Sequence, residues 1–197
     1  MKKSDALISF IIGFFIGVFF FVGLKIIKIE ISCSWLLIII FPPLALFGMF
    51  IASLLGKKFL FILQAARFLL VGALNTFIDL GVLNFLMWVF GIAVGVSYSV
   101  FKAISFLAAT VNSYFWNKYW TFEKKERKPG PKEFIKFLII TTIGFLINVG
   151  IASFVVNVIG PQFGMTEVTW GNIGAFAAVF VAWIWNFIGV KFIVFKY

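Results

Sequence analysis

Six long apolar runs restrict this chain to the membrane more firmly than any other feature of its sequence. The runs cover about 6–24, 34–55, 68–90, 97–117, 134–158 and 168–190. Each is close to the roughly 20 residues that a helix needs to cross a bilayer. They are continuously apolar instead of alternating with period two, which predicts helices and not the strands of a membrane barrel. With 63% hydrophobic and 12% charged residues, we expect an all-α polytopic membrane helix bundle.

The composition also excludes most familiar active sites. The chain has no His and a single Cys, Cys33, so it cannot build a Cys/His zinc site, a Cys-His pair or a disulfide within one subunit. It has no Walker loop, no dinucleotide-binding glycine motif and no paired acidic metal motif. We therefore expect no cofactor, no metal and no enzymatic activity. In a membrane protein a net charge of +10 indicates orientation and contact with anionic lipid, and not nucleic acid.

Two segments at the start of the chain allow more than one interpretation. The first run resembles a signal peptide but is followed by 25–28 without a small-residue cleavage site, so we expect it to stay as a helix. The second run carries Pro42 and Pro43 near its middle, and two missing backbone donors predict either a kinked helix or a re-entrant hairpin.

Positive charge predicts the orientation. With the N-terminus inside, only Lys25, Lys28 and Lys102 of the 17 Lys and Arg residues fall on the outer side. We therefore expect six spans in the cytoplasmic (inner) membrane with both termini cytoplasmic. The polar connection 118–136, with a turn at 129–131, separates two halves.

Those halves resemble each other. Aligning 67–91 with 136–160 places Arg67 opposite Lys136, and the segment 118–122 resembles 191–195. We expect a core of two parallel two-helix repeats, which is a transporter pattern, preceded by an extra helix pair. The corresponding domains are an N-terminal pair at 1–60 and a four-helix domain at 66–196.

Three segments carry a resemblance to a known family: 67–79, 112–122 and 186–195. Together they resemble the GtrA-like family of small four-helix membrane proteins, over about 66–196. The resemblance implies a flippase that moves a polyprenyl-phosphate-linked sugar from the cytoplasmic to the outer leaflet for glycosylation of cell-envelope polysaccharide. Some relatives instead form the membrane domain of a polyprenyl-phosphate sugar synthase. Expected partners are the lipid-linked sugar, membrane lipid, membrane glycosyltransferases and a second copy of the chain. Residues 1–60 exceed the family core, and Lys191 lacks the Asn that precedes Lys118.

A basic ring is the first candidate site. The expected topology places one cation at the cytoplasmic end of each core helix: Arg67, Lys118, Lys136 and Lys191. Arg offers a fork that matches phosphate oxygens and Lys a point charge, so the ring predicts a phosphate-binding site. Ordinary snorkelling of cations to the interface is the alternative for each residue.

A central polar cluster is the second candidate site. Asp79 lies in the middle of an apolar run, where a charge is costly, so we expect it to face the bundle interior. Asn148 is its repeat mate, and Thr110 or Asn112 lies at similar depth. The functional interpretation is a headgroup contact or relay with the carboxyl kept neutral, and the structural one is interhelical hydrogen bonding. The predicted headgroup path consists of Asn75, Asp79, Asn112, Asn117, Asn148 and Asn186.

Further patterns leave alternatives open. Small-residue stripes such as Gly13/Gly17 and Gly144/Asn148 predict close helix packing or a groove for a headgroup. Trp120 and its neighbours predict an aromatic belt or sugar-stacking rings. Two other functions fit the sequence: a subunit that docks a glycosyltransferase through the basic 118–136 loop, or a small proton-coupled exporter that uses Asp79.

Overall fold

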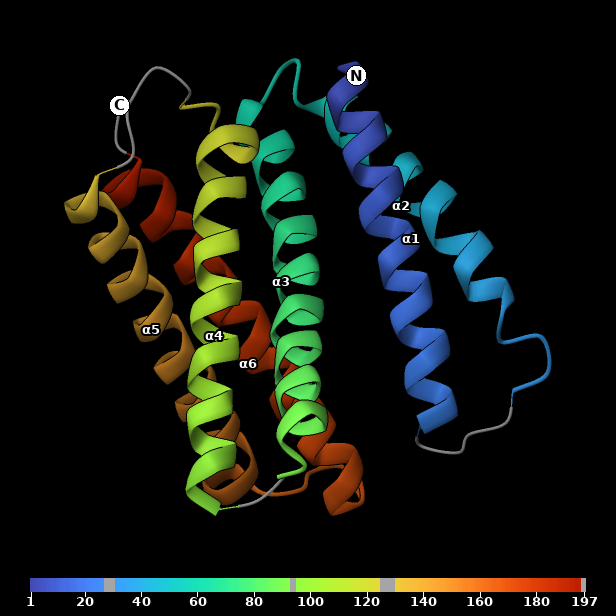
Figure 1. Ribbon diagram of the computed structural model, residues 1–197, viewed down its shortest axis with the longest axis vertical. Helices are drawn as coiled ribbons and strands as arrows, with labels where there is room; N and C mark the ends of the chain where they lie inside the picture. Colours follow the sequence, from blue (N-terminus) through green and yellow to red (C-terminus); the bar gives the residue numbers. More distant parts are fainter. Residues whose placement is uncertain (27–30, 93–94, 125–129, 196–197) are drawn as a thin grey trace. The chain divides into compact units, whose positions relative to one another are not determined.

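The computed structural model describes residues 1–26, 31–92, 95–124 and 130–195, and these residues form helices joined by short connections (Figure 1). The α-helices are α1 (Lys3–Ile26), α2 (Leu36–Leu55), α3 (Leu60–Phe90), α4 (Gly95–Trp116), α5 (Pro131–Ser153) and α6 (Glu167–Gly189). Short π-helical segments follow three of them: η1 (Asn117–Thr121), η2 (Phe154–Ile159) and η3 (Val190–Val194). The described residues contain no strand, and the all-α prediction is confirmed.

Five helical segments are long and apolar enough to cross a membrane. They are Lys3–Val22, Leu36–Leu55, Leu60–Phe90, Pro131–Ile159 and Phe176–Val194. The sixth long helix, α4, has 22 residues, which matches the length of a span. The structure thus supports a polytopic helix bundle, as the apolar runs predict.

The chain packs as two compact units, Met1–Glu123 and Lys124–Tyr197. The first unit contains α1 to α4 with η1, and the second contains α5, η2, α6 and η3. The predicted domains, 1–60 and 66–196, divide the chain by its resemblance to a family, whereas the two compact units divide it by contacts. The predicted domain boundary therefore stays a prediction.

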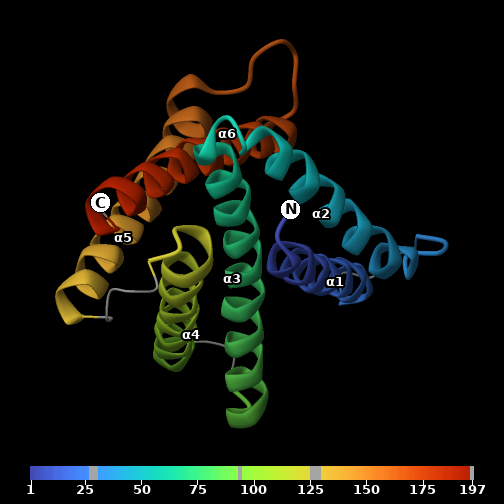
Figure 2. The same ribbon diagram turned by 90° about the horizontal axis from the view of Figure 1, so that it is seen from above.

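In the first unit, α1 and α2 form a tight antiparallel pair (Figures 1 and 2). A Cβ atom added to Gly17 would lie 2.5 Å from the Leu37 carbonyl oxygen, and one added to Gly13 would lie 2.7 Å from the Phe41 carbonyl oxygen. Only glycine permits this approach of the two backbones. The close-packing interpretation of the Gly13/Gly17 stripe is confirmed.

The second apolar run is one continuous helix, α2, which contains Pro42 and Pro43. The expectation of a re-entrant hairpin was therefore wrong. Each proline removes a single backbone donor, and a membrane helix tolerates this loss where neighbouring helices cover it. Pro42 is buried and faces the α1 glycine Gly13.

Each unit also contains one antiparallel core pair, α3 with α4 in the first and α5 with α6 in the second. In both pairs the π-helical segment after the second helix packs against the beginning of the first helix. In the first unit Phe68 and Phe122 pack with ring centroids 6.4 Å apart, and in the second Phe137 and Phe195 pack at 6.5 Å. These matching contacts support the internal repeat.

Candidate functional site

A polar stripe runs along α3 and faces α4 and η1. Arg67, Asn75 and Asp79 lie at multiples of four residues on α3, so they share one face of the helix. With Val71 filling the intermediate position, the stripe extends over about 18 Å at 1.5 Å per residue. That length exceeds half of a hydrocarbon core about 30 Å thick. Each of the three polar residues has a partner from the neighbouring helix or turn.

Arg67 lies at one end of the stripe and is almost completely buried, with 2% of its surface exposed. Its Nη2 donates to Asp5 Oδ2 at 2.9 Å, and its Nη1 donates to Glu123 Oε1 at 2.7 Å and to the Trp120 carbonyl at 2.9 Å. The indole Nε1 of Trp120 donates to the other Asp5 oxygen at 2.9 Å. Arg67 is therefore held by two carboxylates and does not snorkel, which corrects that alternative for this residue.

The prediction missed both carboxylates. Asp5 is buried in the first turn of α1, and Glu123 follows η1. The one available signal was an acid within the first residues of an apolar helix, and nothing in the sequence relates residue 5 to residue 67. The interpretation of Trp120 as a belt residue also misses its role, because this side chain is 6% exposed and its N–H is used inside the protein.

Glu123 connects the buried Arg67 to Lys2 at the protein surface. Lys2 Nζ lies 2.6 Å from Glu123 Oε1 and forms an exposed ion pair with it. Partial burial raises the pKa of Glu123, but hydrogen bonds from Lys2 and Arg67 and their charges outweigh it and hold the pKa below its ordinary value. The four charges of Lys2, Asp5, Arg67 and Glu123 sum to zero.

Asn75 and Asn112 meet in the middle of the seam. Asn112 Nδ2 donates to Asn75 Oδ1 at 2.8 Å. The sequence placed Thr110 or Asn112 at the depth of Asp79, but Asn112 pairs with Asn75, one helical turn away from Asp79, and Thr110 donates to the Phe106 carbonyl of its own helix.

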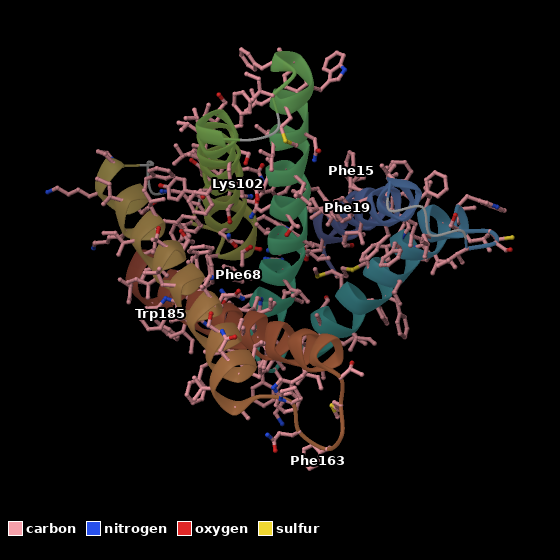
Figure 3. All side chains as sticks on the ribbon, turned by 90° about the horizontal axis from the view of Figure 1, so that it is seen from below. Phe15, Phe19, Phe68, Lys102, Phe163 and Trp185 are labelled. Carbon is pink, nitrogen blue, oxygen red and sulfur yellow. The ribbon has the colours of Figure 1, made fainter. Side chains whose placement is uncertain are left out.

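Asp79 ends the stripe and is paired with a cation. Lys102 Nζ donates to Asp79 Oδ2, and Ser105 Oγ donates to Asp79 Oδ1 at 2.6 Å. Figure 3 shows Lys102 at the seam between α3 and α4. The pairing of Asp79 with Lys102 was not predicted, and the interpretation of a neutral carboxyl stays a prediction. Lys102 was not identified from the sequence as a partner of Asp79, because it was counted only among the cations on the outer side of the membrane.

The turn after α4 buries two further predicted residues. Asn117 and Lys118 are 1% and 0% exposed, and both belong to η1. Asn117 Nδ2 donates to the Ser113 carbonyl at 2.9 Å. Lys118 Nζ donates to the Tyr114 hydroxyl at 3.4 Å and lies 5.6 Å from the centroid of that ring. Lys118 is thus completely buried, with its ammonium group beside the Tyr114 ring.

The second unit repeats part of this arrangement. Lys191 belongs to η3, and its Nζ lies 5.7 Å from the centroid of Phe187, which occupies the position of Tyr114. Both π-helical segments end with the same bond, from Phe122 N to the Asn117 carbonyl and from Phe195 N to the Val190 carbonyl, each 2.9 Å long. Lys136 is exposed on α5.

The seam of the second unit is closed by small residues. A Cβ atom on Gly144 would lie 2.1 Å from Asn186 Oδ1, and one on Gly189 would lie 2.6 Å from Ile140 Cγ2. Close packing is therefore confirmed between α5 and α6 at these two glycines, and the headgroup groove stays a prediction. Asn186 contacts Gly144, and Asn148 is half-buried on α5.

Some predictions concern both units or residues outside the described ranges. The convergence of four cations into one ring and the approach of Asn148 to Asp79 join the two units and stay predictions. The docking-loop residues Lys125, Arg127 and Lys128 lie outside the described residues. Among the residues that the structure describes, no group of three His, Cys, Asp or Glu could hold a metal ion.

Comparison with known proteins gives two matches. The profile of the family described as GtrA/DPMS, transmembrane domain, matches residues 67–195. The uncharacterized membrane protein YngA of Bacillus subtilis (strain 168) is 45% identical over 74 residues, which are 38% of this chain and 46% of YngA. The match thus spans less than half of that relative, and no solved structure matches the chain. Because the profile covers more than half of the chain and contains the whole α3–α4 seam, this protein belongs to the GtrA/DPMS transmembrane-domain family.

Proposed function

We propose that this protein is a flippase that moves a polyprenyl-phosphate-linked sugar from the cytoplasmic to the outer leaflet for glycosylation of cell-envelope polysaccharide. Family membership supports the class of substrate. The observation that carries the proposal is the polar stripe from Arg67 through Asn75 to Asp79 along the α3–α4 seam. A soluble headgroup needs such a series of hydrogen-bonding groups to cross a layer that offers none.

The Arg67 end provides the phosphate contacts. A guanidinium group presents paired N–H donors that match two phosphate oxygens, and the Trp120 indole N–H converges with it on one anionic group. Lys118 is on the adjacent turn and adds a second cation. In the second unit Lys136 and Lys191 lie at the corresponding end of α5 and α6, and we include them in the proposed phosphate-binding set.

The middle of the seam suits the sugar hydroxyls. Asn75 and Asn112 have both donors and acceptors, so they can exchange their mutual hydrogen bond for bonds to a hydroxyl. An interhelical hydrogen bond in a membrane protein contributes about 0.6 kcal/mol, so the exchange costs little. At Asp79 the charge is balanced by Lys102, which limits repulsion of the phosphate while the prenyl tail stays in lipid.

The direction of transport follows from the charge distribution. We place the Arg67 end and both termini on the cytoplasmic side, because most Lys and Arg residues then face inward. Membrane glycosyltransferases would supply the lipid-linked sugar on one side and consume it on the other. A pair of two-helix repeats is a small transporter core, so a homodimer is part of the proposal.

Headgroup translocation in proteoliposomes tests this function. A short-chain polyprenyl-phosphate monosaccharide is incorporated into both leaflets, and an impermeant oxidant, periodate, destroys the sugars on the outside. With the protein present, we expect the inner pool to become accessible; in empty vesicles it stays protected.

A matched pair of variants tests the seam. Asn75→Ala removes a seam hydrogen bond, whereas Asn84→Ala removes an exposed amide that donates only to the Leu80 carbonyl of its own helix. We expect Asn75→Ala to slow translocation by about tenfold, a change of 1.4 kcal/mol in the barrier, and Asn84→Ala to leave it unchanged. A rate equal to that of empty vesicles for the unmodified protein would exclude the flippase function.

A further inference from the structure

The Arg67–Trp120 pair has the geometry of an oxyanion-binding site, and a carboxylate of the same chain occupies it. Arg67 Nη2 and Trp120 Nε1 each lie 2.9 Å from a different oxygen of Asp5. Asp5 is 1% exposed and Arg67 is 2% exposed. Two donors from different helices thus converge on the two oxygens of one buried anionic group, and a phosphate ester offers two oxygens in a similar arrangement.

The carboxylate comes from outside the family domain. The family profile begins at residue 67, so both donors belong to the shared domain and Asp5 belongs to the preceding helix α1. The two donor groups, Arg67 and Trp120, therefore lie within the family domain, whereas the carboxylate that they bind, Asp5, lies outside it. The second carboxylate on Arg67, Glu123, binds a different nitrogen and does not contact Trp120 Nε1 in the described contacts.

The rest of the α1 interface can separate without exposing apolar surface to water. Ile12 packs in a cluster with Val71 and Trp120, and Phe19 packs against Phe77 of α3. In a bilayer the released surfaces would contact lipid tails, which are as apolar as the helices, so these contacts lack a hydrophobic driving force. The hydrogen bonds from Arg67 and Trp120 to Asp5 are consequently the most specific attachment of the α1 N-terminus.

We propose that Asp5 is a built-in competitor at a phosphate-ester site formed by Arg67 and Trp120, and that a lipid phosphate replaces it there. The inference rests on the proposed function for its choice of ligand. Exchange of one anion for another keeps Arg67 neutralised, so the site is never a buried, unpaired cation. The N-terminal helix thereby keeps the phosphate site closed until an anionic lipid arrives.

Equilibrium binding of geranylgeranyl phosphate to the full chain in nanodiscs is the test, with geranylgeraniol as the neutral lipid of equal tail length. Asp5→Asn keeps the size of the side chain but places an amide opposite Arg67. If the docked form outnumbers the free form ten to one, removal of the competitor tightens phosphate binding by about tenfold. Ser9→Ala is the matched control, since it changes a buried polar side chain of the same helix that donates to the Ala6 carbonyl and does not alter the charge beside Arg67, and we expect less than a twofold change. Binding of geranylgeraniol should be the same in all three proteins.

A second measurement does not depend on the Asp5 variant. A spin label at the exposed position Ser4, introduced as Ser4→Cys in a Cys33→Ser background, reports the mobility of the α1 N-terminus. Geranylgeranyl phosphate should increase this mobility, while geranylgeraniol should not. A label at Lys57, which is exposed beyond the end of α2, should not respond to either lipid.

The possible results separate this inference from the proposed function. The proposal that Asp5 is a competitor would be overturned if folded Asp5→Asn bound geranylgeranyl phosphate with unchanged or lower affinity. It would also be overturned if the label at Ser4 stayed immobile at a saturating concentration of geranylgeranyl phosphate. If Asp5→Asn does not fold, the Ser4 label decides alone. Tighter binding of geranylgeranyl phosphate by Asp5→Asn, without headgroup translocation by the unmodified protein, would support Asp5 as a competitor and exclude the flippase function. Headgroup translocation with unchanged binding by Asp5→Asn would support the flippase function and exclude Asp5 as a competitor.

Discussion

The two repeats share their packing but differ in the polarity of their seams. Phe68 and Phe122 pack in the first repeat as Phe137 and Phe195 do in the second, and a lysine in each π-helical turn lies over an aromatic ring. Along the seam, however, Asn75 corresponds to Gly144 at the repeat offset.

For the second helix of each repeat, the alignment of 118–122 with 191–195 places Ser105 opposite Ala178 and Asn117 opposite Val190. In the first seam, polar side chains of the two helices form hydrogen bonds and an ion pair with one another. In the second seam, Gly144 lies against Asn186, and the Trp185 indole donates to the Ile140 carbonyl. The comparison teaches that duplication preserved the contacts that determine helix packing and left the polar path in one copy. Helix packing and the polar side chains of the seam can therefore be altered separately, one repeat at a time.

The largest expected contrast is between Arg67 and its repeat mate Lys136. Arg67→Met leaves Asp5 buried without its cation, which should lower the free energy of unfolding by about 3–5 kcal/mol. Lys136 is exposed, and Lys136→Met should change it by less than about 0.5 kcal/mol. Denaturation in detergent micelles measures both.

A double variant tests whether the unpaired Asp5 carboxylate causes the loss of stability in Arg67→Met. Adding Asp5→Leu to Arg67→Met removes the orphaned carboxylate, so most of the lost stability should return. Equal losses for Arg67→Met and Lys136→Met would mean that the two repeats are held in the same way.

Much of the fold could be predicted from the sequence, because a bilayer permits only helices and closed barrels, and continuously apolar runs of this length fit helices. Depth could be predicted only to within one helical turn: counting from the basic end placed Asn112 beside Asp79, whereas its partner is Asn75. The Asp5–Arg67 contact could not be predicted, since 62 residues separate the partners and no pattern of period 3.6 relates them. The π-helical turns were likewise missed, because an apolar run does not show a change in backbone hydrogen bonding.

A glycine substitution tests whether contact closes the second seam. Gly144→Ala would place a Cβ atom 2.1 Å from Asn186 Oδ1, which forces the Asn186 side chain to move and should cost about 1–2 kcal/mol. Gly150 lies on the same helix with open space around it, so Gly150→Ala should be neutral or stabilising. Thermal unfolding of the two variants in nanodiscs gives the comparison. A loss at Gly150 as large as that at Gly144 would contradict the contact model.

A double-mutant cycle measures the charged end of the first seam. Asp79→Asn, Lys102→Gln and the double variant should give a coupling energy of about 0.6–1.7 kcal/mol, the range of polar interactions in membrane helices. Asn148 is the repeat mate of Asp79, and Asn148→Ala should cost less than about 0.6 kcal/mol. Unfolding free energies in micelles provide all values. Additive single losses would mean that Asp79 and Lys102 do not interact in the bilayer.

The smallest expected effect is the pH dependence at Glu123. Because its folded-state pKa lies below the ordinary value of 4.5, Glu123 stabilises the protein above about that pH and loses this contribution as the pH falls through the lowered pKa. Lys2 and Glu123 are 60% and 42% exposed, so screening should keep the effect below about 1 kcal/mol. The difference in unfolding free energy between the unmodified protein and Glu123→Gln should therefore shrink between pH 6 and pH 3.

Contributions from carboxylates that do not contact Arg67 or Lys2 are common to both proteins and cancel in that difference. In the alignment that pairs 118–122 with 191–195, position 123 corresponds to Lys196, a basic residue in place of the carboxylate. The acid-sensitive attachment of the N-terminus is thus specific to the first repeat, where Glu123 holds both Lys2 and Arg67. A difference that stayed constant with pH would show that Glu123 contributes through its shape and not through its charge.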